Sequence, residues 1–189
     1  MLLIGESDKA AGDALLASYA MTLDNDPPVQ RMSWVNAEIA KIAVNTYVTT
    51  KISYANMIAE ICDRLPGADV DAVTSALGRD SRIGPKYLKG ALGYGGPCFP
   101  RDNVALAALA RGLGLTADVA VATDTVNRRQ SQRVVDIVHR LKPNGAVAVL
   151  GMAYKPDTPV VEESQGIDIA RKLADLAYKV LIHDPLALT

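Results

Sequence analysis

The chain has 189 residues, enough for one substantial core or two small ones. Hydrophobic residues make up 49% and charged residues 22%, which excludes a disordered or fibrous chain. A formal charge of −1 predicts no electrostatic affinity for nucleic acid or an anionic membrane, and no apolar run is long enough to span a bilayer. Two cysteines are too few for a disulfide framework and indicate a reducing compartment, so the cytoplasm is the expected location.

The chain starts with a short apolar strand at residues 2–4, followed by a helix at 8–20 and a loop at 24–28. Nothing precedes this strand to complete a sheet, and a second lone strand lies at the other end of the chain. Lone strands at both ends are unusual in a complete domain. We therefore expect a fragment of a longer protein, in which residues 1–30 are the tail of one domain.

A long helix without internal glycine or proline is predicted over residues 36–65. Its apolar residues cover most of the circumference, so it needs covering on several sides by its own fold or by a partner subunit. Further helices are predicted at about 69–77, 103–112 and 117–141. Residues 31–142 are therefore expected to form a mainly α domain.

After a turn at residues 143–145 the pattern changes to strand, helix and strand, at 146–151, 164–178 and 179–182. This spacing predicts a parallel βαβ unit over residues 143–189. The expected fold class is therefore a mainly α domain with a long helix, followed by the start of an α/β domain.

The segment at residues 93–102 reads GYGGPCFPRD and has the strongest chemical character in the chain. Glycines permit close approach of the backbone to a ligand, and prolines on both sides of Cys98 stiffen the loop. A helix follows directly, so Cys98 lies near a helix N-terminus, where the dipole favours a thiolate. Asp102 is close enough to cap this helix or to orient a water molecule. A buried loop cysteine with no chemical role is an equally good interpretation.

Other candidates are less specific. Four cations precede the glycine loop and favour an anionic ligand such as a phosphate over a solvated loop: Arg79, Arg82, Lys86 and Lys89. Lys41 and Asn45 are one helical turn apart and could aim two donors at one point, although a solvated face is the commoner case. Cys62 lies on an apolar helix face and is expected to pack in the core.

The βαβ unit raises the possibility of a dinucleotide site, because Asp184 follows its second strand, where an acid can hold a ribose. However, the turn after the first strand, residues 151–157, reads GMAYKPD and lacks the G-x-G-x-x-G pattern. Lys155 in this turn is better suited to a phosphate or a carboxylate. No spacing of His, Cys and acidic residues indicates a metal.

Four motifs in this order resemble the UDP-glucose/GDP-mannose dehydrogenase family, and its UDP-glucose 6-dehydrogenases in particular. The motifs are NAEIAKIAVN at 36–45, RIG with YLK at 82–89, GYGGPCFPRD at 93–102, and GMAYKPDT at 151–158. The resemblance implies an NAD-binding Rossmann domain, a central helical dimerisation domain and a Rossmann-like domain for the nucleotide sugar. It also implies a homodimer formed through the long helix.

The family reaction oxidises the C6 alcohol of a nucleotide sugar to a carboxylate with NAD⁺, through a cysteine thiohemiacetal and thioester. By resemblance, Cys98 is the nucleophile, Lys41 and Asn45 stabilise oxyanions, and Asp102 positions water. The residues assigned to the nucleotide sugar are Arg82 (reaching the neighbouring subunit's UDP), Tyr87, Lys89, Gly95, Phe99, Tyr154 and Lys155, the last also facing the cofactor.

Three departures from the family pattern stand out. Arg101 replaces a common lysine. Glu162 stands where many members have an arginine, so the cofactor contact of that arginine is not expected in this chain. The NAD fingerprint and the catalytic glutamate of the family are absent from the sequence, so the chain alone is not expected to turn over. The alternatives are a non-catalytic dimerisation or ligand-binding module, and a dehydrogenase for GDP-mannose or a UDP-N-acetyl-aminosugar.

Overall fold

The computed structural model describes residues 1–187, and within them the chain forms six helices and four strands. It divides into two compact units, Met1–Asn45 and the chain from Thr46 onward. The predicted class, mainly α followed by an α/β unit, is confirmed. Within residues 1–187, none of the helices combines the length and the apolar composition that a membrane span needs.

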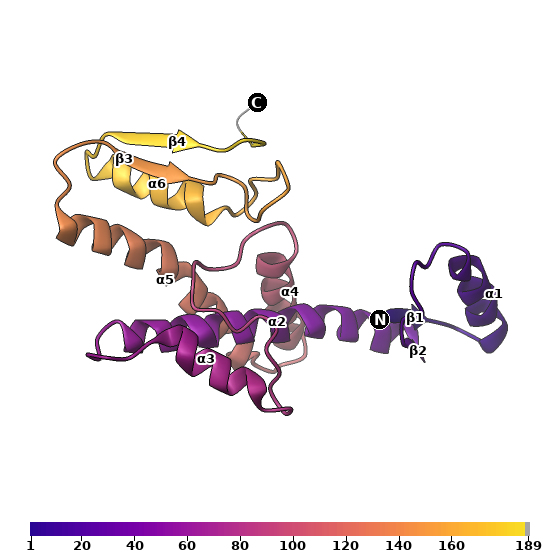
Figure 1. The fold of residues 1–189 in the computed structure, drawn as a ribbon. Coiled ribbons are helices and arrows are strands. Elements are labelled where there is room, and N and C mark those ends of the chain that lie inside the picture. Colours follow the sequence, from indigo (N-terminus) through magenta and orange to yellow (C-terminus); the bar gives the residue numbers. More distant parts are fainter. Residues whose placement is uncertain (188–189) are drawn as a thin grey trace. The chain divides into compact units, whose positions relative to one another are not determined.

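The first unit begins with a strand, a helix and a second strand: β1 (Leu2–Gly5), α1 (Lys9–Ala20) and β2 (Val29–Met32) (Figure 1). The two strands pair in parallel, with Leu2 opposite Val29. The expectation that the first strand stands alone was therefore wrong. β2 escaped prediction because its four residues, VQRM, are half polar and follow two prolines.

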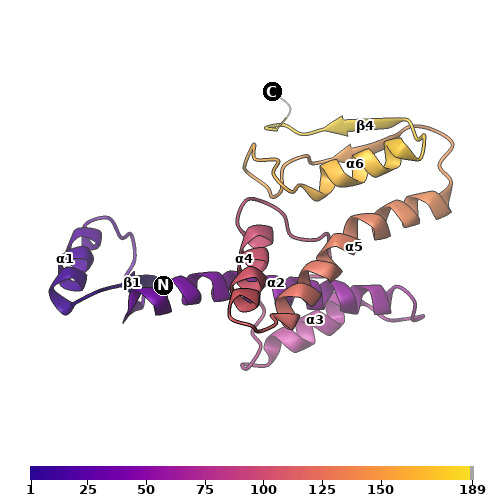
Figure 2. The ribbon, with the colours of Figure 1, turned by 180° about the vertical axis from the view of Figure 1, so that it is seen from behind.

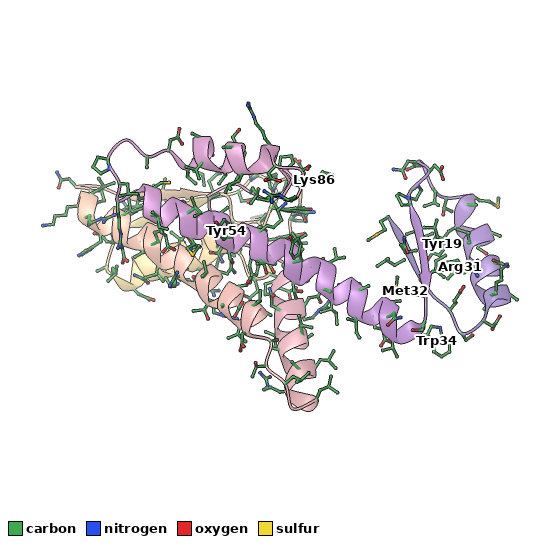
Figure 3. The ribbon with its side chains drawn as sticks, turned by 90° about the horizontal axis from the view of Figure 1, so that it is seen from below. Tyr19, Arg31, Met32, Trp34, Tyr54 and Lys86 are labelled. Atoms are coloured by element: carbon green, nitrogen blue, oxygen red, sulfur yellow. The ribbon has the colours of Figure 1, made fainter. Side chains whose placement is uncertain are left out.

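Arg31 of β2 joins the three elements of this unit (Figure 3). Its guanidinium binds the carboxylate of Glu6 at 2.6 Å and donates to the carbonyl of Lys9 at 2.8 Å, and it also pairs with Asp13. These carboxylates raise the pKa of Arg31. A Cβ at Gly12 would overlap the carboxylate of Glu6 and the guanidinium of Arg31, so a larger residue here would push this ion pair out of its place.

Helix α2 (Trp34–Cys62) is the long helix predicted at 36–65. Beyond Asn45, its buried face is small and polar rather than apolar. The buried side chains there are Thr46, Thr49, Ser53, Ala55, Asn56 and Ala59. Several large apolar residues of α2 are exposed instead, which reverses the usual arrangement of a helix in a globular protein.

Three further helices complete the helical part of the second unit: α3 (Val70–Arg79), α4 (Phe99–Gly112) and α5 (Asp118–Leu141). Helix α4 begins four residues before the predicted start at 103. Pro100 lies in its first turn, where a missing N–H costs nothing, so the proline belongs to the helix and not to the loop.

The predicted βαβ unit is confirmed as β3 (Val147–Leu150), α6 (Gln165–Asp175) and β4 (Val180–His183), with the strands parallel. Helix α6 covers one face of the two strands and packs its other side on α5 (Figure 2). The core between them is formed by Val135, Ile169 and Leu173.

Asp184 ties the carboxyl ends of β3 and β4 together. One carboxylate oxygen accepts the N–H groups of Met152 and Ala153 at 2.7 and 2.9 Å, and the other accepts those of Leu186 and Ala187 at 2.8 and 2.7 Å. These bonds, led by that of Ala153, hold the pKa of Asp184 far below its usual range.

Because the folded-state pKa of Asp184 is lowered, the carboxylate stabilises the fold fully at pH values above its unfolded pKa of about 3.9. This stabilisation is lost as the pH falls through the lower folded-state value. Asp184→Asn should therefore be less stable than the parent at neutral pH, and the difference should narrow below about pH 4. Urea unfolding across this range tests the expectation. Asp175→Asn, an exposed carboxylate on α6, is the control, and an equal effect in the two variants would contradict it.

Candidate active site

Cys98 is the N-cap residue of α4 and is exposed. The exposure argues against the alternative of a buried loop cysteine. As the N-cap, Cys98 lies beside the free N–H groups in the first turn of a 14-residue helix, and its side chain makes no capping hydrogen bond to them. Asp102 is buried one turn further along, its N–H donating to the carbonyl of Cys98 at 2.9 Å. The turn therefore brings a thiol and a carboxylate to neighbouring positions on one helix face.

The glycines before Cys98 make close contacts with the chain itself. The N–H of Gly96 donates to the carbonyl of Glu162 at 2.9 Å. A Cβ at Gly95 would overlap the carbonyl oxygen of Glu163, and one at Gly96 would meet the ring of Tyr154. We expected the glycines to leave space for a ligand. In the structure, the segment between β3 and α6 occupies the space beside Gly95 and Gly96.

Two buried asparagines hold the backbone at the start of this loop. Asn56 of α2 accepts the N–H of Ala91 at 2.8 Å and donates to the carbonyl of Leu92 at 3.3 Å. Asn127 of α5 accepts the N–H of Tyr94 at 2.7 Å and donates to its carbonyl at 3.0 Å. Sequence reasoning assigned neither asparagine to the site, since both bind residues more than 30 positions away in the chain.

Tyr94 fills the space between the loop and α4. Its ring packs edge-on against Phe99, with the ring centres 6.1 Å apart. Its hydroxyl accepts a hydrogen bond of 3.0 Å from the buried Asn103. Burial, with the carboxylate of Asp124 nearby, raises the pKa of Tyr94, so the hydroxyl stays protonated. Asn103 also donates to the carbonyl of Phe99 at 3.2 Å, which fixes the first residue of α4.

A cavity of about 480 Å³ opens at the carboxyl ends of β3 and β4. Its walls include Gly93, Tyr154, Lys155, Asp157, Gln165 and Asp184. The ammonium of Lys155 lies 5.5 Å from the ring centre of Tyr154, which holds a positive charge at this edge. The amide oxygen of Gln165 is buried and has no hydrogen-bond partner among the described residues, so a hydroxyl donor from a ligand would satisfy it.

The cationic segment before the glycine loop is largely exposed. Arg82 forms a paired contact with Asp80, with nitrogen–oxygen distances of 3.0 and 2.6 Å, which raises the pKa of Arg82. Lys51 of α2 donates to the carbonyls of Ile83 and Gly84 and so anchors the turn. Tyr87 has a φ of 63° and is exposed, and Lys89 is exposed as well. The exposed side chains of Tyr87 and Lys89 can contact a ligand or another protein surface.

Lys41 and Asn45 lie one turn apart on α2 and belong to the first unit, whereas Cys98 and the cavity belong to the second. Lys41 is exposed and Asn45 is partly buried. Their assignment to oxyanions stays a prediction.

The described βα turns do not by themselves fit a dinucleotide. The turn after β1 (Gly5, Glu6, Ser7, Asp8) and the turn after β3 (residues 151–157) have one glycine each. Asp184, the candidate for a ribose contact, already accepts four backbone N–H groups. Residues 1–187 also contain no group of three His, Cys, Asp or Glu side chains that could hold a metal ion.

Two family models match the chain. The central domain of the UDP-glucose/GDP-mannose dehydrogenase family matches residues 35–129, and the UDP binding domain of the same family matches residues 148–189. The first match covers α2 to the middle of α5, including Cys98, and the second covers the βαβ unit and the cavity at its edge.

Individual relatives agree with these matches. UDP-glucose 6-dehydrogenase TuaD of Bacillus subtilis is 39% identical over 85% of this chain and 35% of its own length. UDP-glucose 6-dehydrogenase AglM of Haloferax volcanii is 36% identical over 98% of this chain and 44% of its own. A UDP-glucose dehydrogenase structure from Pyrobaculum islandicum is 37% identical, with a TM-score of 0.90 over 98% of this chain and 43% of that one.

The chain therefore spans less than half the length of these relatives. Within that span, the two domain matches, the identities and the structural likeness agree with the four sequence motifs. The chain belongs to the UDP-glucose/GDP-mannose dehydrogenase family.

Proposed function

We propose that the chain forms the thiol-bearing part of an NAD-dependent dehydrogenase that oxidises the C6 alcohol of UDP-glucose to a carboxylate. The observation that carries this proposal is the exposed thiol of Cys98 at the N-terminus of α4, one turn from the buried carboxylate of Asp102. The loop that leads to Cys98 begins at Gly93, in the wall of the cavity at the edge of the βαβ unit.

The choice of UDP-glucose rests on the relatives. Those that share 36 to 39% identity with the chain are named UDP-glucose 6-dehydrogenases. UDP-N-acetyl-mannosamine dehydrogenase structures, such as that of Staphylococcus aureus at 24% identity, share the fold alone. The match of residues 148–189 to a UDP binding domain supports a uridine nucleotide at the cavity.

The residues of this chain account for the covalent part of the reaction. The thiolate of Cys98 attacks the aldehyde carbon formed at C6, a C–S bond forms, and the carbonyl oxygen takes a proton to give a thiohemiacetal. Its oxidation gives a thioester. Water then attacks the thioester carbon, the C–S bond breaks, and the carboxylate and the thiol are released. Asp102 holds this water or takes its proton. NAD⁺ is the oxidant in both oxidation steps.

The remaining residues are assigned either to binding the sugar nucleotide or to stabilising the oxyanion. Lys41 and Asn45 stabilise the negative charge at C6. Tyr154 and Lys155 bind the substrate at the cavity, where Lys155 also faces the cofactor. Further substrate contacts are assigned to Tyr87, Lys89 and Phe99, and Arg82 reaches the UDP of the partner subunit.

The proposed nucleophile can be tested without any oxidation step. The C6 aldehyde of UDP-glucose should add to Cys98 and protect it from iodoacetamide at least tenfold, since the thiohemiacetal has no free thiol. UDP-glucose, which has the same nucleotide but no aldehyde, should protect less than threefold. Mass spectrometry of the peptides that contain Cys98 and Cys62 measures both effects, with Cys62 as the internal control. Equal protection by the two compounds would rule out covalent addition.

Lys155 provides a test of the binding site. Lys155→Gln should weaken UDP-glucose binding at least tenfold, about 1.4 kcal/mol, because the cation at the cavity is lost. Lys179→Gln removes the same charge at the amino end of β4 and should leave binding within twofold of the parent. Isothermal titration calorimetry measures both variants, and equal affinities in the two would contradict the assignment.

We also propose that the chain forms a homodimer through α2. Tyr47, Tyr54 and Ile61 recur every seven residues on this helix and are 67%, 46% and 48% exposed. Figure 3 shows Tyr54 on α2. A seven-residue repeat keeps side chains on one helix face, which is the pattern of a helix that pairs with another. Since the side chains that α2 buries within the fold are small and mostly polar, we assign this apolar face to a second copy.

Tyr54→Arg combined with Ile61→Arg should convert the dimer into a monomer, because each subunit would place two unpaired cations in the interface. Analytical ultracentrifugation measures the change. Val104→Arg introduces the same charge at an exposed apolar position of α4 and should stay dimeric. A dimer that survives the double substitution would exclude this face of α2 as the interface.

A further inference from the structure

The structure shows how the Cys98 loop is held at its centre. The side chain of Asn127 makes two opposed hydrogen bonds to Tyr94: its oxygen accepts the N–H at 2.7 Å, and its nitrogen donates to the carbonyl at 3.0 Å. Both residues are 5% exposed. A side-chain amide can thus replace the neighbouring strand that would otherwise satisfy these main-chain groups.

Gly93 makes this arrangement possible. A Cβ at this position would overlap the amide oxygen of Asn127 and would lie 3.0 Å from the amide oxygen of Gln165. Any other residue here would displace the side chain of Asn127 from Tyr94. Gly93 therefore serves the Asn127 contact, just as Gly95 and Gly96 serve the contacts with Glu163 and Tyr154.

The hold on Tyr94 extends to the thiol through two contacts. The ring of Tyr94 packs against Phe99, the residue that follows Cys98. Asn103 binds both the hydroxyl of Tyr94 at 3.0 Å and the carbonyl of Phe99 at 3.2 Å. A shift of Tyr94 therefore moves the N-terminus of α4, where Cys98 is the cap.

We propose that Asn127 is a positioning residue for the Cys98 thiol. By holding both main-chain groups of Tyr94, it keeps the loop in the one conformation that places the sulfur at the N-terminus of α4. This inference rests on the proposed function only in taking Cys98 as the nucleophile. Asn127 itself touches neither the thiol nor the cavity at β3 and β4 in the structure.

The test uses the chain with Cys62→Ala, so that Cys98 is its one thiol. Asn127→Ala should slow alkylation of Cys98 by iodoacetamide at least threefold at pH 7, because release of Tyr94 moves the sulfur from its exposed position at the start of α4. Hydrogen exchange at residues 93–97 should rise at least tenfold.

Gln130→Ala is the matched control. Gln130 is also buried on α5, and it hydrogen-bonds to Glu60 at 2.8 Å instead of to the loop. This variant should keep alkylation and loop exchange within twofold of the parent, even where its melting temperature falls. A folded Asn127→Ala with parental alkylation and exchange would overturn the proposal, and so would the same changes in Gln130→Ala.

Two further variants decide the question if Asn127→Ala does not fold. Asn127→Asp keeps the acceptor for the N–H of Tyr94 but cannot donate to its carbonyl, and Gly93→Ala pushes the amide away from the opposite side. Both should reproduce slower alkylation at pH 7 and faster loop exchange, and parental values in both would overturn the proposal. Aldehyde protection of Cys98 in the parent is a separate readout: its failure counts against the proposed chemistry and not against the positioning role.

Discussion

The loop that carries Cys98 is held by hydrogen bonds to its main chain. A segment with three glycines in four positions has few side chains to pack, and glycine loses more conformational freedom on folding than any other residue. Buried amides provide the missing constraint. Asn56 binds Ala91 and Leu92, Asn127 binds Tyr94, and the carbonyl of Glu162 binds Gly96. The position of the thiol depends on these contacts.

This constraint explains the unusual distribution of polarity on α2. Asn56 binds the main chain of the loop, while Thr49 binds Asn103 of α4 and Ser53 donates to the carbonyl of Thr123 in α5, so these polar side chains of α2 are buried. Its large apolar residues then remain on the surface. Buried polar groups carry no penalty here because each one has a partner. The same polarity pattern leaves an exposed apolar face on α2, where we propose that a second copy packs.

Much of the architecture could be predicted from the sequence. The long helix and the βαβ unit follow from hydrophobic periodicity and the placing of Gly and Pro, which act locally. The strand β2 could not be predicted, because its stability comes from pairing with β1 and from the ion pairs of Arg31 with residues distant in the chain rather than from an apolar strand pattern. The start of α4 was placed too late because prolines were taken as loop residues.

The residues of the candidate site also divide into those that the sequence predicts and those that only the fold reveals. Cys98 and Asp102 are neighbours along one helix, so their spacing predicts their proximity. Asn103 and Asn127 are ordinary polar residues in helical segments, and only the fold brings them to Tyr94. Asp184 shows the opposite error: its position after a strand indicated a ribose ligand, but its oxygens are occupied by backbone N–H groups.

Recognition of the main chain by Asn127 has an evolutionary consequence. The amide of Asn127 binds only the main-chain N–H and carbonyl of Tyr94, so these two hydrogen bonds do not depend on the identity of the side chain at position 94. Side chains around the loop can therefore diverge without disturbing its anchor. Such a separation lets neighbouring positions change one at a time while the sulfur stays in place, whereas a larger residue at position 93 would also displace Asn127.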